Sequence, residues 1–238
     1  MAKSQPKAAV TPRRPRRWLR TLLGLVVVVF PLVIAGVLAS QIPQFYVDRL
    51  HVGDEEKLEE LASQFLSRGS RLYNSIVTGS NVWRESFDEA SINGWLAYDL
   101  KKNHHRSLPN GVAEPRVALE HDCLRVGFRW GFGPASSVVQ IALKTWVYKE
   151  NHLAVELKGA SAGSLPLPTT YVRRVVESVA ERNGCEIRWK RNGSNLVALI
   201  TLPDRGVKLR RAEVGDGCLI LSGKSVQLAT IRIEKTVR

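Results

Sequence analysis

The sequence predicts an α+β fold: an N-terminal transmembrane helix followed by a long curved antiparallel sheet of hairpins packed around one or two helices. Three observations predict it. An uncharged apolar run follows a basic N-terminus, apolar residues then recur at helical spacing, and from Arg116 onward they alternate with polar residues between frequent turn signals. A helical period followed by a period of two is typical of helices that cover an antiparallel sheet.

The apolar part of the uncharged run, Leu22 to Ala39, is long enough for a helix that crosses a bilayer. Pro31 lies within it, and membrane helices tolerate proline because neighbouring groups satisfy the freed backbone. We therefore assign residues 1–20 to a basic cytoplasmic tail and residues 21–42 to a transmembrane helix.

Charge predicts the orientation of this helix. The residues before it are basic and include no acid, whereas the stretch after it is mainly acidic. Basic flanks stay inside, so we expect a single-pass protein of the cytoplasmic (inner) membrane with its N-terminus in the cytoplasm and its C-terminal domain outside. The arginines expected to determine this topology are Arg13, Arg14, Arg16, Arg17 and Arg20.

A cleavable signal peptide is the alternative to a retained anchor. Val37, Leu38 and Ala39 before Ser40 resemble a small-residue cleavage site. The apolar run is longer than the hydrophobic region of most signal peptides, which favours the anchor. Both interpretations export the domain.

The formal net charge of +13 does not indicate nucleic-acid binding, because much of it lies in the tail. Beyond residue 20 the chain has 28 basic and 22 acidic residues, a balance that forms no basic stripe for phosphates. We expect no nucleic acid among the partners.

The three cysteines do not predict a metal site or a dense disulfide framework. Cys123, Cys185 and Cys218 are far apart and form no C-x-x-C pair. A Cys185–Cys218 disulfide is possible in an exported domain, and buried thiols are the alternative. His104-His105 and His121 with Asp122 lie in expected turns, so no metal and no cofactor is predicted.

Two helices are expected before the sheet. Apolar residues recur at helical spacing from Leu58 to Val77, and Asp54 is placed to cap that helix, with Gly69 as a possible interruption. After a strand from Val82 to Phe87, Asp88 is placed to cap a second helix. We assign residues 43–81 to an amphipathic helical stalk and residues 82–238 to an exported α+β domain.

Alternating residues predict the hairpins of the sheet. Leu124, Val126, Phe128 and Trp130 alternate after a turn at His121-Asp122, and similar alternation runs from Val139 to Val147 and from Leu153 to Leu157. A helix is expected from Thr169 or Thr170 to Asn183-Gly184, and Asn192-Gly193 is a hairpin signal. A last turn at 215–217 should precede two final strands.

One motif has the pattern of a hydrolase active site. Gly159-Ala160-Ser161-Ala162-Gly163 matches the G-x-S-x-G turn that carries a nucleophilic serine between a strand and a helix. Leu165-Pro166-Leu167-Pro168 follows at once and cannot begin that helix, and the last histidine, His152, precedes Ser161, so the usual residue order cannot be completed. We therefore predict no catalytic residues and no enzyme.

Large aromatic side chains are the other candidate for function. They either line a ligand cleft or fill a core, and for any single residue the core is the more common role. The set is Trp83, Trp95, Trp130, Phe132, Trp146, Tyr148 and Trp189.

The order of features from residue 82 to residue 225 resembles a known family. Phe87-Asp88-Glu89-Ala90-Ser91-Ile92-Asn93-Gly94-Trp95-Leu96 is similar to the T-E-x-x-L-N-x-x-L helix of the YpmS-like and LmeA-like membrane-anchored proteins, which belong to the tubular lipid-binding (TULIP) superfamily. Paired hairpins and Gly163-Ser164-Leu165-Pro166-Leu167-Pro168 before a helix complete the resemblance, and Ile92 replaces the usual leucine before Asn93.

The resemblance implies a curved sheet around a helix, with an apolar groove for acyl chains and no catalytic motif. It predicts a membrane-anchored extracytoplasmic module that binds membrane lipid or another apolar ligand in the cell envelope. The alternative is a protein-interaction or structural module with an envelope protein partner and no ligand cavity. The residues expected to line or gate the groove are Trp95, Leu96, Trp130, Trp146, Leu165 and Leu167.

Overall fold

The computed structural model describes residues 17–50, 53–79, 81–104, 107–131, 133, 136–182, 184–203 and 206–225, with side chains in the first helix described from Val29 onward. The chain divides into two compact units, Met1–Val37 and Leu38–Arg238. The predicted tail up to residue 16, which includes Arg13, Arg14 and Arg16, and the last expected strand lie outside the described residues.

The first unit contains most of α1 (Arg17–Ser40), which includes Pro31 and remains helical through it. At 1.5 Å per residue its 24 residues span about 36 Å, slightly more than the hydrocarbon thickness of a bilayer. Phe30, Leu32 and Val33 are all exposed. A single N-terminal helical stretch, Val29–Leu50 among the described residues, is long and apolar enough to cross a membrane.

The last part of that stretch belongs to the folded domain. Phe45 and Tyr46 of the short helix α2 (Gln44–Leu50) are buried with Ala118 and Val138 in a hydrophobic cluster. The apolar segment that is available to a bilayer therefore lies within α1.

Helix α3 (Glu55–Val77) and helix α4 (Glu89–Ala97) begin where the aspartates predict. The Asp54 side chain accepts a hydrogen bond from the Lys57 N–H, and the Asp88 side chain accepts one from the Ser91 N–H. These bonds satisfy amides that have no partner inside a helix. Helix α3 continues through Gly69, so the expected interruption is not found. A short helix, α5 (Asp99–Asn103), follows α4.

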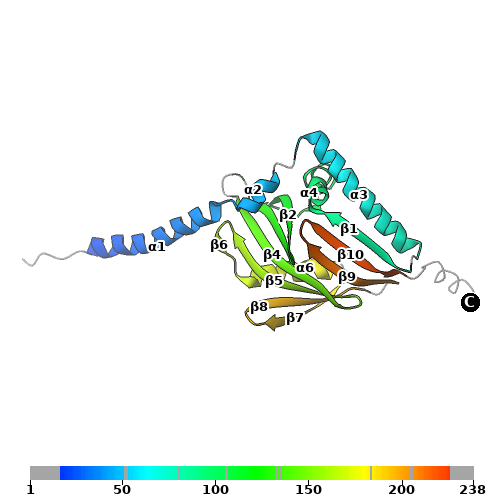
Figure 1. Cartoon of the computed structure of the whole chain (residues 1–238). Helices are drawn as coiled ribbons and strands as arrows, with labels where there is room; N and C mark the ends of the chain where they lie inside the picture. Colours follow the sequence, from blue (N-terminus) through cyan, green and yellow to red (C-terminus); the bar gives the residue numbers. More distant parts are fainter. Residues whose placement is uncertain are drawn as a thin grey trace, which may run out of the picture. The chain divides into compact units, whose positions relative to one another are not determined.

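The strands form two antiparallel sheets, and not the one long sheet that the sequence predicts (Figure 1). The smaller sheet has the order β1-β10-β9, where β1 is Trp83–Asp88, β9 is Val207–Gly215 and β10 is Cys218–Ser225. Trp83 of β1 lies opposite Gly223 of β10 across 140 positions of sequence, and this long-range pairing is what separates the sheet from the hairpins. Helix α3 lies along it (Figure 1).

The larger sheet has seven strands in the order β2-β3-β4-β5-β8-β7, with β6 paired to the end of β5. Hairpin turns at 121–122, 150–151 and 193–194 join neighbouring strands. The first lies where the sequence predicts it, and the last includes Gly193 of the predicted Asn192-Gly193 signal. The strands are β2 (Val112–Glu120), β3 (Cys123–Trp130), β4 (Ser137–Lys149), β5 (His152–Ala162), β6 (Leu165–Pro166), β7 (Glu186–Asn192) and β8 (Asn195–Thr201).

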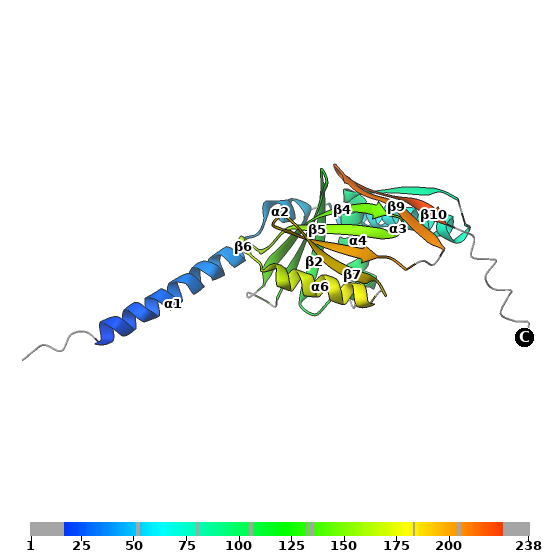
Figure 2. The same cartoon turned by 90° about the horizontal axis from the view of Figure 1, so that it is seen from below.

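Helices α2 and α6 (Thr169–Arg182) lie on opposite faces of the seven-stranded sheet (Figure 2). A Cβ added to Gly127 of β3 would meet the rings of Phe45 and Tyr46, which places α2 on the face that includes Gly127. Trp189 of β7 points to the other face, where its Nε1–H donates to Glu177 of α6 at 2.7 Å. We call these the α2 face and the α6 face.

The segment assigned to an amphipathic helical stalk, residues 43–81, packs on the rest of its own compact unit. Helix α2 packs against β2, and α3 packs closely against α4 and β1. The Phe65 ring of α3 lies 5.4 Å from that of Phe87 and 5.3 Å from that of Trp95. The amphipathic pattern that suggested a stalk is the pattern of a helix that buries one face on its own domain.

Gly94 of α4 is predicted to be essential for the α3–α4 packing. An added Cβ would overlap the Leu61 Cβ of α3 and lie 3.2 Å from the Ala62 amide nitrogen. Gly94→Ala should lower the free energy of unfolding by about 1 to 3 kcal/mol, as overpacking does elsewhere. Chemical unfolding of the full chain in mild detergent, followed by near-UV circular dichroism, measures the change.

Gly69→Ala is the matched control, because an added Cβ at Gly69 meets no atom within 4 Å. Alanine is the better helix former, so this variant should be neutral or more stable by up to about 1 kcal/mol. Equal losses in the two variants would contradict the close packing at Gly94.

Candidate functional site

The α6 face of the seven-stranded sheet is apolar over most of its width. The strand register places Val126 of β3 opposite Ile141 of β4, and Leu143 of β4 opposite Leu157 of β5. Leu157 lies opposite Leu196 of β8 in turn. Directly opposed residues point to the same side of a sheet, so this aliphatic set forms one surface.

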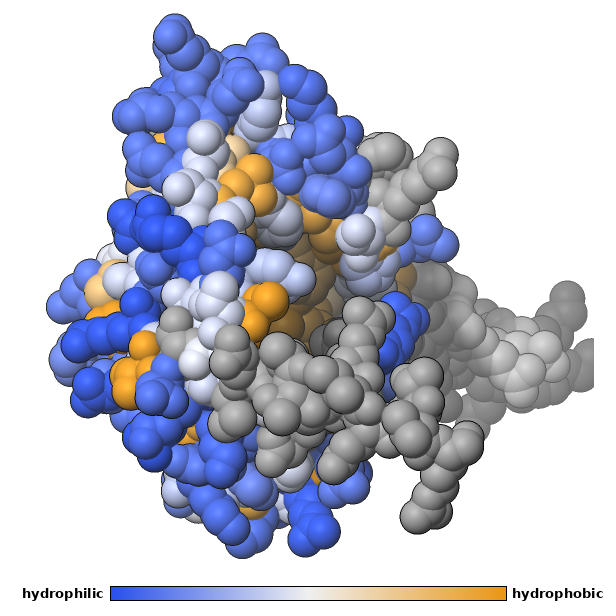
Figure 3. Space-filling view, turned by 90° about the vertical axis from the view of Figure 1, so that its right-hand side faces the viewer, coloured by the Kyte–Doolittle hydropathy of each residue, from blue (hydrophilic) through white to orange (hydrophobic). Residues whose placement is uncertain are grey.

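Helix α6 covers only part of this surface. It lies against β5 and β7, where Leu157 is buried. Over β3 and β4 four apolar residues of this face, Val126, Phe128, Ile141 and Leu143, are only half-buried, whereas Val139 is buried. Hydrophobic side chains also gather at the floor of a hollow with a hydrophilic rim, on the side of the molecule where β9 and β10 lie (Figure 3). An aliphatic sheet face left partly open is a candidate binding surface for an apolar ligand.

The six residues that the sequence predicts for the groove do not come together. Trp95 and Leu96 belong to α4, where the Trp95 ring packs on Phe65 of α3 and its indole N–H is buried with no hydrogen-bond partner in the described residues. Trp146 is half-buried and lines a cavity of about 380 Å³ together with Arg210, Arg211 and Glu213.

Trp130, Leu165 and Leu167 lie at the end of the sheet that joins α1. Trp130 is 56% exposed and lies opposite Ser137, whose hydroxyl donates to the Ala39 carbonyl. Leu165 pairs with Ala162 in β6, and the Leu167 N–H donates to the Ala160 carbonyl at 2.9 Å. This half of the predicted set therefore marks one region, the end of the domain that follows α1.

The aliphatic residues of the α6 face were not among the predicted groove residues. The signal for them is the alternation that predicts the hairpins, since Leu124, Val126 and Phe128 already share one side of β3. The aromatic residues drew attention because of their size, although aromatics serve a core as readily as a cleft.

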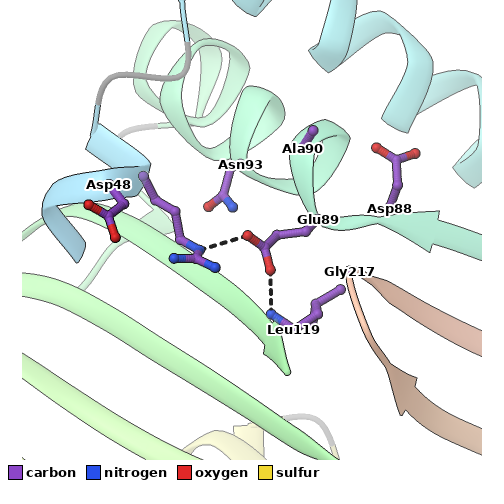
Figure 4. A pocket seen from close by; sticks show the side chains of 8 residues that line it. Asp48, Asp88, Glu89, Ala90, Asn93, Leu119 and Gly217 are labelled. Carbon is purple, nitrogen blue, oxygen red and sulfur yellow. Dashed lines mark hydrogen bonds and ion pairs between the residues drawn. The ribbon is translucent and has the colours of Figure 1, made fainter. Parts of the chain in front are cut away.

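A polar pocket of about 570 Å³ lies where α2, α4 and the edge of β2 meet (Figure 4). Glu89 is at its centre: one carboxylate oxygen accepts from Arg49 Nε at 2.7 Å and the other accepts from the Leu119 N–H at 2.6 Å. Asn93 lies beside it, and its side-chain amide bonds both the N–H and the carbonyl of Val117. These side chains are occupied in holding α4 to β2, so the pocket has a structural explanation.

Burial shapes the electrostatics between α2 and β2. Arg116 is 6% exposed, and its guanidinium donates to the backbone carbonyls of Arg49 and Pro115. Desolvation lowers the pKa of Arg116, while Tyr46 and Glu114 act in the opposite direction. Burial also disfavours the charged form of Tyr46 and so raises its pKa; the Tyr46 hydroxyl donates to the Glu114 carbonyl. These contacts fix α2 to the sheet.

The chemical motifs of the sequence have ordinary structural surroundings. Ser161 lies within β5 rather than on a strand-to-helix turn, and its hydroxyl accepts from Gln140 and donates to the Gly163 carbonyl. Cys123, Cys185 and Cys218 are half-buried and form no disulfide. Among the residues that the structure describes, no three His, Cys, Asp or Glu side chains gather as a metal would need; His105 lies outside them.

No family model, no curated protein and no solved structure matches this chain.

Asn93 is predicted to hold the unpaired edge of the large sheet. Asn93→Ala should lower the free energy of unfolding by about 1 to 3 kcal/mol, because two half-buried backbone groups of Val117 lose their partners. Thermal unfolding of the full chain in detergent measures the loss. Asn103→Ala, which removes an exposed side chain bonded to Asp99, is the control and should cost less than about 1 kcal/mol. Similar losses in both variants would contradict this role.

Proposed function

We propose that this chain is a membrane-anchored, extracytoplasmic module that binds acyl lipid on the α6 face of its large sheet. The observation that carries the proposal is the half-buried aliphatic surface over β3 and β4. The apolar helix α1 supplies the anchor, and the basic N-terminus, with Arg17 and Arg20 in its last part, sets the orientation with the domain outside. The resemblance of residues 82–225 to TULIP proteins agrees with this function.

Transfer energetics favour a lipid over a soluble ligand. Burial of apolar surface contributes about 25 cal/mol per Å², or about 0.8 kcal/mol for each CH₂. A lipid leaves its bilayer only for a comparably apolar surface, because the free energy lost on leaving the bilayer must be regained on binding. The α6 face offers aliphatic side chains from β3 to β8, which suits an acyl chain and offers little to a polar ligand.

A protein-interaction module is the second candidate, and a specific observation favours it. Leu66, Tyr73 and Val77 of α3 are exposed and lie on one stripe of the helix, since they are seven and four residues apart. Such a stripe fits the groove of an envelope protein partner. This surface is separate from the α6 face, so the two candidate functions can be tested separately.

Photolabelling tests the lipid proposal. The full chain is placed in phosphatidylcholine vesicles that contain a phospholipid with a diazirine in its acyl chain, and the labelled peptides are identified by mass spectrometry after irradiation. We expect labels on β3, β4 and β5 in addition to α1, because an acyl chain on the α6 face contacts Val126, Ile141 and Val155. Labels confined to α1 would contradict the proposal.

A pair of variants makes the test specific to one face. Ile141→Asn puts a polar group on the α6 face and should reduce labelling of the domain several-fold. Leu199→Asn changes an equally half-buried residue on the opposite side of the sheet, because Leu199 lies opposite Ala154 and not Val155. It should leave the labelling unchanged, and circular dichroism shows that both variants remain folded.

A further inference from the structure

The end of the domain that joins α1 carries exposed apolar residues on both sides of the junction. Ile42 is 51% exposed directly after α1, and Trp130 is 56% exposed at the end of β3. Tyr171 is 61% exposed in the first turn of α6, which begins five residues after Ser164. Helix α6 begins close to β6 (Figure 2).

Leu38 and Ala39, near the C-terminal end of α1, bond to this end of the domain. The Ser164 N–H donates to the Leu38 carbonyl at 2.8 Å, and the Ser137 hydroxyl donates to the Ala39 carbonyl. These bonds satisfy carbonyls at the end of α1 that have no partner within the helix. An added Cβ at Gly163 would overlap the Leu38 carbonyl, and Gly163 has a φ of +56°, so a glycine is required here on both counts.

Basic residues flank the exposed aromatics. Arg173 and Arg174 follow Tyr171 in α6 and are exposed, and Arg173 forms an ion pair with Glu177. Arg129, which forms an ion pair with Glu114 and has 41% of its side chain exposed, precedes Trp130 in β3. Tryptophan and tyrosine concentrate at the headgroup level of membranes because one part of the ring system is apolar and another is polar. Arginine beside them adds attraction to anionic headgroups.

We propose that this anchored end, marked by Ile42, Trp130 and Tyr171, is an interfacial surface that seats in the headgroup region of the same bilayer that α1 crosses. The α6 face begins at Trp130 and Ser137, so a lipid reaches it from the membrane without crossing water. This consequence rests on the proposed function. The opposite end of β4 carries Tyr148, which is also exposed but lies 11 residues from Ser137, or about 36 Å along the strand.

Quenching of tryptophan fluorescence tests the seating. The full chain is reconstituted in vesicles whose lipids carry bromine near the headgroup end of the acyl chain. Trp130 is the exposed tryptophan of this surface, so Trp130→Phe should remove a large part of the quenched signal. Trp146→Phe and Trp189→Phe, which change half-buried residues, should leave it unchanged. If Trp130→Phe keeps the full quenched signal, the proposal is overturned.

Two variants in the Trp130→Phe background test whether an added tryptophan restores the quenched signal. Tyr171→Trp should restore the lost quenching, whereas Tyr148→Trp, with an exposed ring at the far end of β4, should not. Equal quenching of the two added tryptophans would overturn the proposal, because it would show contact that is not limited to the anchored end.

The outcome separates this inference from the lipid-binding function. Quenching at Trp130 without photolabelling of the α6 face supports the interfacial seat and contradicts the lipid site. Photolabelling of that face without quenching at Trp130 supports the lipid site and contradicts the seat.

Discussion

Two asparagine side chains, Asn93 of α4 and Asn151 of the β4–β5 turn, bond the free edges of the two sheets, and the arrangement of the domain depends on them. A side-chain amide donates and accepts as a peptide group does, so it can take the place of a neighbouring strand. Asn93 bonds the N–H and the carbonyl of Val117 on the edge of β2. Asn151, in the β4–β5 turn, donates to the Val207 carbonyl at 2.9 Å and accepts from the Leu209 N–H at 2.7 Å on the edge of β9. Each edge is thus satisfied at that point without another strand, which also protects it there from pairing with a second chain.

Local sequence signals predicted the elements, whereas the long-range pairing could not be predicted. Asp54 and Asp88 cap the helices that they were expected to cap, and the hairpin turns lie where Asp122, Asn151 and Gly193 indicate. The pairing of β1 with β10 depends on residues far apart in sequence, and no short-range pattern encodes it. The same is true of the packing of α3 against Gly94, which turns an expected stalk into part of the core.

The sequence predicts which residues of the candidate site share one side of a strand, but not which of these sides stays exposed. Alternation shows that Val126 and Phe128 share one side of β3, yet it does not show which side a helix covers. That depends on where α2 and α6 settle, and hence on contacts such as those of Gly127 with Phe45 and Tyr46, and of Trp189 with Glu177. For the same reason Trp95 and Trp146 were expected in one groove, although Trp95 packs between helices and Trp146 lies beside Arg210.

The open aliphatic surface is easier to explain near a membrane than in free solution. A partly exposed sheet face lowers stability because its apolar area stays in water, and a soluble domain would gain from a second helix over β3 and β4. Helix α6 is placed too far toward β7 to do so. A tethered domain meets lipid at a far higher local concentration than a free one, since the anchor makes the encounter intramolecular. In the proposed function the exposed surface serves as an acceptor for lipid, and the bonds of Leu38 and Ala39 to Ser164 and Ser137 hold the end of α1 to the domain.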